Sequence, residues 1–348
     1  MFLIALRDLQ WRRRRFLIGV IATGLVFALA LLITGMGASF SNEVRRTVRF
    51  MGADAWVVPR SSSGPFTAAS AFPASVANDV AKEPGVKAAS ALAVLHFTVR
   101  APSLRDINVI GVTIGGVGAP HPDRGRTLRT PGELVANSSL GRHIGDALVI
   151  GGKSFKVVGT THGISFLGGT PAVFISLADA QAIALGDQRL ATSIVTSGVP
   201  QRLPAGMRTM TNAAVISDLS RPLKHATQTI TFLCVLLWIV AAGIIGSVVY
   251  LQALERVRDF AVLKATGTTN GALLAGLAFQ SVLLSLAAAV AAVVLSTLLA
   301  PLLAMPAEIS AGAYALLPLV AVIVGLLASL FGLRRAVGVD PALAFGSA

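Results

Sequence analysis

The chain has 348 residues, of which 54% are hydrophobic and 13% are charged, and it carries a formal net charge of +13. Soluble domains contain about 25% charged residues, so this composition excludes an ordinary soluble protein. The basic excess is not a sign of nucleic-acid binding, because the chain has no zinc-ligand spacing, no recognition-helix pattern and no interleaving of aromatic with basic residues.

Four apolar runs without Asp, Glu, Lys or Arg divide the sequence. A bilayer core about 30 Å thick needs about 20 helical residues, so each run is long enough to cross it. We therefore predict an α-helical integral membrane protein with four transmembrane helices and one α+β extracytoplasmic domain inserted between spans 1 and 2. The spans are expected at residues 16–38, 230–251, 272–300 and 313–333, and the inserted domain with its stalk helices at 39–226.

The basic residues of the short segments predict the orientation. They gather in the basic amphipathic segment 1–15, in the loop 252–270 and in the tail 334–348, whereas the loop 301–312 has no Lys or Arg. Short loops rich in Lys and Arg stay in the cytoplasm. Both termini and the 252–270 loop are therefore expected inside, with the inserted domain and the short 301–312 loop outside.

The inserted domain carries mixed signals for helices and strands. Helices are expected at 74–82 and 176–185, strands at 55–58, 86–99, 106–112 and 192–195, and a hairpin from 148–150 and 155–158. Gly152-Lys153-Ser154 resembles the end of a phosphate-binding loop, but Ala147 stands where that motif needs its first glycine, so a turn is predicted instead. The five histidines are scattered. We therefore predict no catalytic, cofactor-binding or metal-binding residue in this chain.

The spans contain no ionisable side chain that could couple transport to an ion gradient. They do contain small residues four positions apart, a spacing that lets helix backbones approach closely. These pairs are candidate packing faces of a homodimer, and packing within one protomer is the alternative. The residues are Ala242 with Gly246, Gly243 with Ser247, and Gly325 with Ser329.

The segment LERVRDFAVLKATG, residues 254–267, follows the second span. Its apolar residues recur on about one helical face, and its charged residues lie mostly on the others. Gly267 is placed to end the helix, and residues 268–270 can cap the next one. Such an amphipathic helix suits the docking of a soluble partner, and an anchor at the bilayer surface is equally compatible with the pattern.

Residues 255–267 match the motif E-R-x-R-E-[IF]-[AG]-[IV]-L-[KR]-A-x-G, with Asp259 replacing the usual Glu. With the tail 334–345, this motif makes the chain resemble the FtsX/MacB/LolC-type ABC transporter permeases, most closely their small, four-span, efflux-type members. The resemblance implies that the 254–266 helix is the coupling helix, seated in a groove of the ATPase. The residues that match the coupling motif are Glu255, Arg256, Val257, Arg258, Asp259, Phe260, Leu263, Lys264 and Gly267.

The resemblance also implies the partners and the setting. A permease of this type works with two copies of an ABC ATP-binding subunit and a second copy of itself, in contact with membrane lipid and, in some members, an extracytoplasmic accessory protein. ATP and Mg would be bound by the ATPase, so this chain would bind no cofactor and would not be an enzyme. The implied location is the bacterial cell (inner or plasma) membrane. The implied role is export or extraction of an amphiphilic or lipophilic substrate, and the alternative is mechanical control of an outer partner such as a cell-wall hydrolase.

Overall fold

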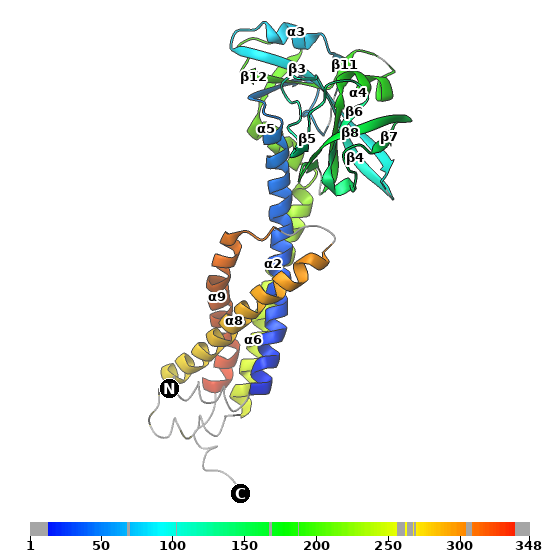
Figure 1. The fold of residues 1–348 in the computed structure, drawn as a ribbon. Coiled ribbons are helices and arrows are strands. Elements are labelled where there is room, and N and C mark those ends of the chain that lie inside the picture. Colours follow the sequence, from blue (N-terminus) through cyan, green and yellow to red (C-terminus); the bar gives the residue numbers. More distant parts are fainter. Residues whose placement is uncertain are drawn as a thin grey trace. The chain divides into compact units, whose positions relative to one another are not determined.

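The computed structural model in Figure 1 describes residues 13–67, 70–101, 103–166, 169–186, 188–255, 262, 267, 269–303 and 308–337. The chain divides into two compact units. One is a helical unit, Met1–Ser39 with Thr227–Ala348, and the other is an outer domain, Phe40–Ala226. Each unit has its own hydrophobic core.

The helical unit is built from four long helices, which the apolar runs predicted. Within the described residues, all four are long and apolar enough to cross a bilayer. They are α2 (Arg13–Phe50), α6 (Lys224–Glu255), α8 (Asn270–Leu299) and α9 (Ala311–Val337), with a short 3-10 turn η2 (Ala300–Leu302) after α8. Their shared core includes Phe27, Ile245, Ala288 and Ala321, one residue from each helix. The predicted four-span membrane architecture is therefore confirmed.

The outer domain is a mixed α+β fold around one large sheet, as predicted. Its strands are β1 (Ala55–Pro59), β2 (Phe72–Pro73), β3 (Val86–Arg100), β4 (Leu104–Val112), β5 (Arg124–Gly125), β6 (Glu133–Asn137), β7 (Ala147–Ile150), β8 (Lys153–Thr161), β9 (Ser165–Phe166), β10 (Thr170–Ser176), β11 (Leu190–Ala191), β12 (Ser193–Gly198) and β13 (Met207–Thr211). Its helices are α3 (Val76–Ala81), η1 (Ser138–Leu140), α4 (Leu177–Ala184) and α5 (Asn212–Ser220).

The strands follow the order β13-β1-β12-β3-β4-β10-β6-β8-β5, with β7 paired to β8 and β9 to β10, while β2 and β11 form a separate pair. Most pairs are antiparallel, but β10 runs parallel to β4 and β6 runs parallel to β8. Successive side chains of a strand point to opposite faces. Trp56 and Val57 of β1 accordingly belong to different clusters, Trp56 beside Val48 of α2 and Val57 beside Val80 of α3.

The local predictions for the outer domain hold within a few residues. The strands expected at 55–58, 86–99, 106–112 and 192–195 are β1, β3, β4 and β12, and the two expected helices are α3 and α4. The expected hairpin joins β7 to β8 through Gly151 and Gly152, whose φ angles of 56° and 80° suit a two-residue turn. Strands β6, β10 and β13 and helix α5 were not predicted.

Candidate functional site

The segment between the second and third spans, expected in the cytoplasm, is described at its two ends. Glu255 is the last residue of α6. Gly267 has a φ of 92°, which glycine adopts readily, and the Thr269 side chain caps α8 by accepting a hydrogen bond from the Ala272 N–H at 3.3 Å. The cap at Thr269 was predicted. The role of Gly267 as a helix terminator stays a prediction, because residues 263–266 lie outside the described residues. Between these ends only Val262 is described, as a helical residue with its side chain 51% exposed. The coupling helix therefore stays a prediction for Arg256, Val257, Arg258, Asp259, Phe260, Leu263 and Lys264, which lie outside the described residues.

The small-residue pairs of the spans fall into two groups. Gly325 and Ser329 of α9 are buried in the protomer, and a Cβ added at Gly325 would lie 3.0 Å from the Val282 Cα and 3.1 Å from the Ser281 carbonyl oxygen of α8. On α6, Gly246 is buried and Ala242 half-buried, whereas Gly243 and Ser247 are exposed. Gly325 and Ser329 therefore pack α9 onto α8, and the Gly243–Ser247 face is uncovered in the protomer.

Gly325→Ala is expected to lower the thermal stability of the helical unit, because α8 and α9 must move apart to admit the methyl group. Overpacking of this kind costs about 1–3 kcal/mol. The matched control is Gly243→Ala, since a Cβ at Gly243 meets no atom within 4 Å. Size-exclusion profiles of heated, detergent-solubilised protein measure the midpoint temperature of thermal unfolding for each variant. An equal midpoint for the two variants would contradict the close approach of α8 and α9.

A second candidate site lies within the outer domain, where the chain enters it from α2 and leaves it towards α6. We use "junction" for the C-terminal turns of α2 with β1, β13 and α5. Strand β1 follows α2 and pairs with β13, which leads into α5 and then α6. The Trp56 Nε1–H donates to the Asn212 Oδ1 at 2.8 Å, and the Asn212 amide donates to the Ala53 carbonyl at 2.8 Å. The segments that carry both helices into the domain are thus bonded directly to each other.

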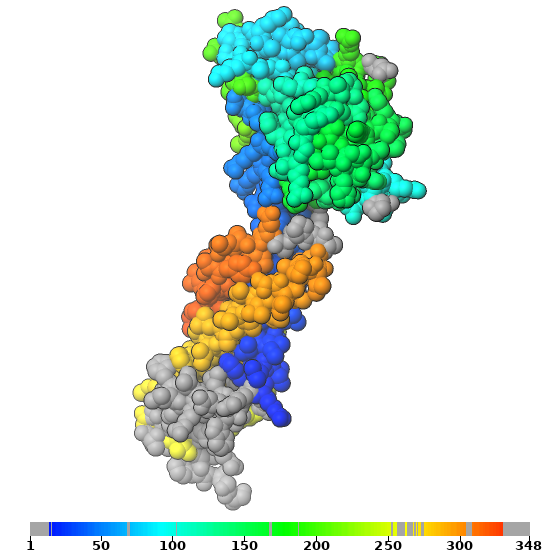
Figure 2. All heavy atoms as spheres, in the orientation of Figure 1, coloured from blue at the N-terminus to red at the C-terminus, as the bar shows by residue number. Residues whose placement is uncertain are grey.

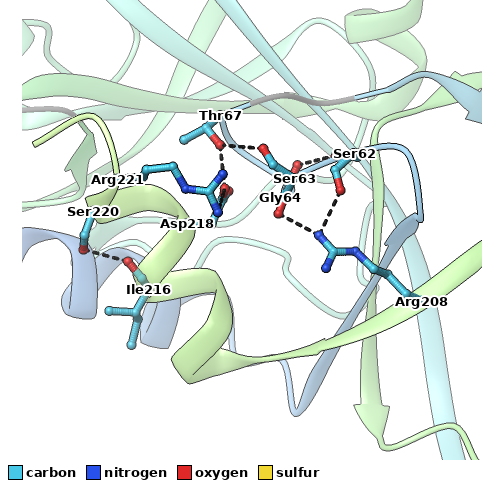
Figure 3. Close-up of polar contacts among 9 residues, drawn as sticks. All are labelled: Ser62, Ser63, Gly64, Thr67, Arg208, Ile216, Asp218, Ser220 and Arg221. Carbon is cyan, nitrogen blue, oxygen red and sulfur yellow. Dashed lines mark hydrogen bonds and ion pairs between the residues drawn. The ribbon is translucent and has the colours of Figure 1, made fainter. Parts of the chain in front are cut away.

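Figure 3 shows the polar contacts that join the loop after β1 to β13 and α5. Arg208 of β13 donates from Nη2 to the carbonyl oxygens of Ser62 at 2.8 Å and Ser63 at 2.7 Å. Thr67 donates from its hydroxyl to the Oδ1 of Asp218 on α5 at 2.6 Å. Phe66 lies between two aromatic rings, with centroid distances of 5.4 Å to Trp56 and 5.1 Å to Phe166. The Arg208 and Phe66 contacts hold this loop against β13, β1 and β9, and the Thr67–Asp218 bond joins it to α5.

Asp218 is the most buried acid of the junction, at 1% exposure. Its Oδ1 accepts from Thr67 and lies 3.9 Å from the Arg221 guanidinium, while its Oδ2 has no hydrogen-bond partner among the described residues. That oxygen faces Gly64, where an added Cβ would lie only 1.9 Å away. Only glycine fits at position 64 beside this carboxylate.

Lys153 of the Gly-Lys-Ser turn also has a structural partner. Its ammonium group lies 2.6 Å from the Oδ1 of Asp179, which is buried at the start of α4. Burial raises the pKa of Asp179, but hydrogen bonds from Lys153, Ser176 and the Gly132 N–H outweigh it and hold that pKa below its ordinary value. Lys153 therefore neutralises a buried carboxylate within the protein, as a turn residue and not as part of a phosphate site.

Glu133 organises the loop that precedes β6. Its carboxylate forms a two-point contact with the Arg126 guanidinium and accepts from the backbone N–H of Arg129 at 2.8 Å and of Thr130 at 3.3 Å. The hydrogen bonds from Arg126, followed by those from the two amides, lower the pKa of Glu133 to about 2 against the opposing effect of burial.

Glu133→Gln is expected to reduce hydrogen-exchange protection of the Arg129 and Thr130 amides by about tenfold at neutral pH, because a charge-assisted acceptor is lost. The folded-state pKa lies below the ordinary value of 4.5 for a glutamate, so the carboxylate contributes fully above that value and loses its contribution as pH falls towards about 2. The ratio of wild-type to variant protection should shrink over this range. A ratio that does not change with pH would contradict the role of the charged form.

Family models and known proteins match nearly the whole chain. Residues 17–205 match the MacB-like periplasmic core domain, and residues 231–341 match the FtsX-like permease C-terminal domain. Two solved structures resemble the outer part at low identity. The extracellular domain of the noncanonic ABC-type transporter YknZ from Gram-positive bacteria has 14% identity and a TM-score of 0.34, covering 46% of this chain and 99% of its own. The periplasmic region of MacB from Actinobacillus actinomycetemcomitans has 11% identity and a TM-score of 0.35. The match covers 51% of this chain and 97% of the MacB chain.

Full-length relatives are much closer in sequence. Uncharacterized ABC transporter permeases of Mycobacterium bovis and Mycobacterium tuberculosis are each 46% identical over 347 residues, and another from Mycobacterium tuberculosis is 44% identical over 347 residues. Each alignment covers 99% of both chains. The permease resemblance drawn from the coupling motif is thereby confirmed, and the ATP-hydrolysing subunit of such a transporter is a separate protein. The chain belongs to the FtsX/MacB-type family of ABC transporter permeases.

Proposed function

We propose that this permease subunit transmits ATP-driven motion of a separate ATPase to its outer domain, and so exports or extracts an amphiphilic or lipophilic substrate. The observation that carries the proposal is the junction. Helix α2 leads into β1, and α5 leads into α6. Strand β1 is bonded to α5 through Trp56 and Asn212, and the loop after β1 is bonded to α5 through Thr67 and Asp218. A displacement of α2 against α6 would therefore act on β1 and α5, which are bonded to each other.

The energy source in this proposal lies outside the chain. The four spans, residues 16–38, 230–251, 272–300 and 313–333, contain no Asp, Glu, His, Lys or Arg, the side chains by which ion-coupled carriers use a gradient. The 254–266 segment would seat in the ATPase from the cytoplasm, where the positive-inside rule also places both termini. Two ATPase subunits would bind ATP and Mg, and two permeases would pair, with the exposed Gly243–Ser247 face of α6 as the candidate contact.

A mechanical relay is the second candidate function, and the junction supports it as well. In that case the outer domain would move a bound extracytoplasmic protein, such as a cell-wall hydrolase, and no substrate would cross or leave the membrane. The two functions share the transmission step and differ in what the outer domain acts on.

The test is purification of this protein from its own membranes, with identification of the bound proteins and ATPase assays in nanodiscs. A stoichiometric ATPase whose hydrolysis rises with a lipophilic compound would support the transporter. An ATPase accompanied by an outer hydrolase, with no response to compounds, would favour the relay. Recovery of the permease without any ATPase would overturn both.

A further inference from the structure

The β3–β4 hairpin ends in exposed side chains that transmission through the junction does not use. Leu104, the first residue of β4, is 69% exposed, more than any other large hydrophobic side chain in the described part of the outer domain. It pairs across the hairpin with Arg100, the last residue of β3, which is also exposed. In Figure 2 the end of this hairpin, in cyan, projects from the body of the outer domain.

Two further arginines are held at this projecting end by backbone carbonyls. The Arg105 Nη1 donates to the Ser139 carbonyl of η1 at 2.9 Å, and the Arg142 Nη2 donates to the Arg100 carbonyl at 3.1 Å. A guanidinium has five N–H donors, so each retains donors for a further acceptor. Ile144, in the loop that also carries Arg142, is 51% exposed. The hairpin end therefore combines an exposed apolar tip with two positioned guanidinium groups, those of Arg105 and Arg142, and the exposed side chain of Arg100.

The acids nearest in sequence to this end already have partners. Asp106 accepts from the Thr98 hydroxyl at 2.7 Å, and Asp146 accepts from the His143 N–H at 2.9 Å. No ion pair joins either acid to Arg100, Arg105 or Arg142 among the residues that the structure describes. The arginines thus present positive charge outward.

We propose that the hairpin end formed by Arg100, Leu104, Arg105 and Arg142 binds anionic phospholipid headgroups at the bilayer surface, with Leu104 in the interfacial layer. Arginine forks match the geometry of phosphate oxygens, and basic residues beside an apolar side chain are the combination that binds an anionic membrane surface. This surface goes beyond the transmission role and does not depend on it.

A lipid surface fits this end better than a protein partner does. A stable protein interface buries about 800 Å² on each side, which one exposed leucine and three arginines on a projecting hairpin do not offer. The outer domain is also connected at both of its ends to helices with bilayer-length apolar runs. This tethering keeps the bilayer at a high effective concentration, so a weak contact suffices.

The experiment uses the full-length protein in nanodiscs, with an environment-sensitive NBD label on Leu104→Cys. The background is Cys234→Ser, which removes the one native cysteine. One set of discs contains phosphatidylcholine alone, and the other contains phosphatidylcholine mixed with phosphatidylglycerol. In the anionic discs, emission should rise about twofold and move to shorter wavelength as the label enters the interface. At 1 M salt, where the screening length is about 3 Å, the change should disappear.

The matched control is the same label on Val199→Cys. Val199 is 57% exposed and follows Gly198, which pairs with Val86 at the opposite end of β3. Because β3 has 15 residues and rises about 3.3 Å per residue, the two labels are roughly 50 Å apart. The Val199 label should give the same emission in both discs. Arg105→Gln with Arg142→Gln should remove at least about half of the Leu104 response, since two phosphate-binding groups are lost.

Several results would overturn the proposal. The first is label emission at Leu104 that is the same in neutral and anionic discs. Low emission in both would mean that the label contacts nothing, and high emission in both would mean that it contacts protein, such as a second copy. A response in neutral discs to added inorganic phosphate would assign a soluble-anion site instead. Hydrogen exchange of the unlabelled wild-type protein gives an independent readout, and the amides of residues 103–106 should exchange more slowly in the anionic discs only.

Discussion

Gly64→Ala is expected to detach the loop after β1 from α5 and to lower the free energy of unfolding of the outer domain by about 2–3 kcal/mol. The new Cβ would lie 1.9 Å from the Oδ2 and 2.1 Å from the Cγ of Asp218. That carboxylate is buried and bonded to Thr67, so it has no alternative position in the junction. The Gly64 backbone lies outside the left-handed region, so the methyl group acts through this clash alone.

Urea unfolding followed by the emission of buried Trp56, in a Trp11→Phe, Trp238→Phe background, measures the loss. Ser63→Ala is the matched control in the same loop. Its free energy of unfolding should stay within about 0.5 kcal/mol of the parent's, because the Ser63 hydroxyl makes only a long contact with the Thr67 hydroxyl, at 3.4 Å. Asp218→Ala should make Gly64→Ala less damaging, with an interaction energy of about 1 kcal/mol or more. Simple additivity of the two substitutions would show that Gly64 and Asp218 do not meet.

Glu255→Ala combined with Arg258→Ala is expected to uncouple the permease from its ATPase while leaving membrane insertion intact. Charged groups at a docked interface contribute about 1.5–3 kcal/mol each, so losing two should weaken ATPase binding by about 100-fold or more. Pull-down of the ATPase at graded concentrations measures the affinity. Substrate-stimulated hydrolysis in nanodiscs measures the coupling, which we expect to be lost.

Arg13→Ala with Arg14→Ala is the control for the coupling variant. It also alters two charged side chains expected in the cytoplasm, yet it lies in the segment before the first span, and Arg7, Arg12 and Arg15 remain to set the orientation. It should bind the ATPase as the parent does. A Glu255/Arg258 double variant that co-purifies with the ATPase and works normally would refute the coupling-helix assignment.

The sequence predicted the features that local patterns encode. Four bilayer-length apolar runs are visible without any knowledge of packing, and so are the strand-like β-branched residues of β3 and the glycine pair between β7 and β8. Thr269 was recognised for the same reason, because a helix cap depends on residues within one turn.

Local patterns could not predict which strands pair when they lie far apart in the sequence. Strands β6 and β10 lie in parallel pairs, whose partners β8 and β4 depend on crossovers that no local signal marks. The junction was missed in the same way. Nothing in the local sequence marks Asp218 or Gly64, because they meet only when the β1–β13 pair brings the loop after β1 next to α5. The small-residue spacing alone did not distinguish Gly325, which packs inside the protomer, from Gly243, which is exposed.

The pairing of β1 with β13 has a consequence for how such permeases diversify. The polypeptide enters and leaves the outer domain on adjacent strands, so residues 40–226 form a cassette with neighbouring ends. A module of different size or specificity can replace this cassette if its own first and last elements are neighbours, because the ends of α2 and α6 then keep their spacing. One four-helix frame can in this way carry many different outer modules, and a chimera with borders at Phe40 and Ala226 is the smallest exchange that preserves the frame.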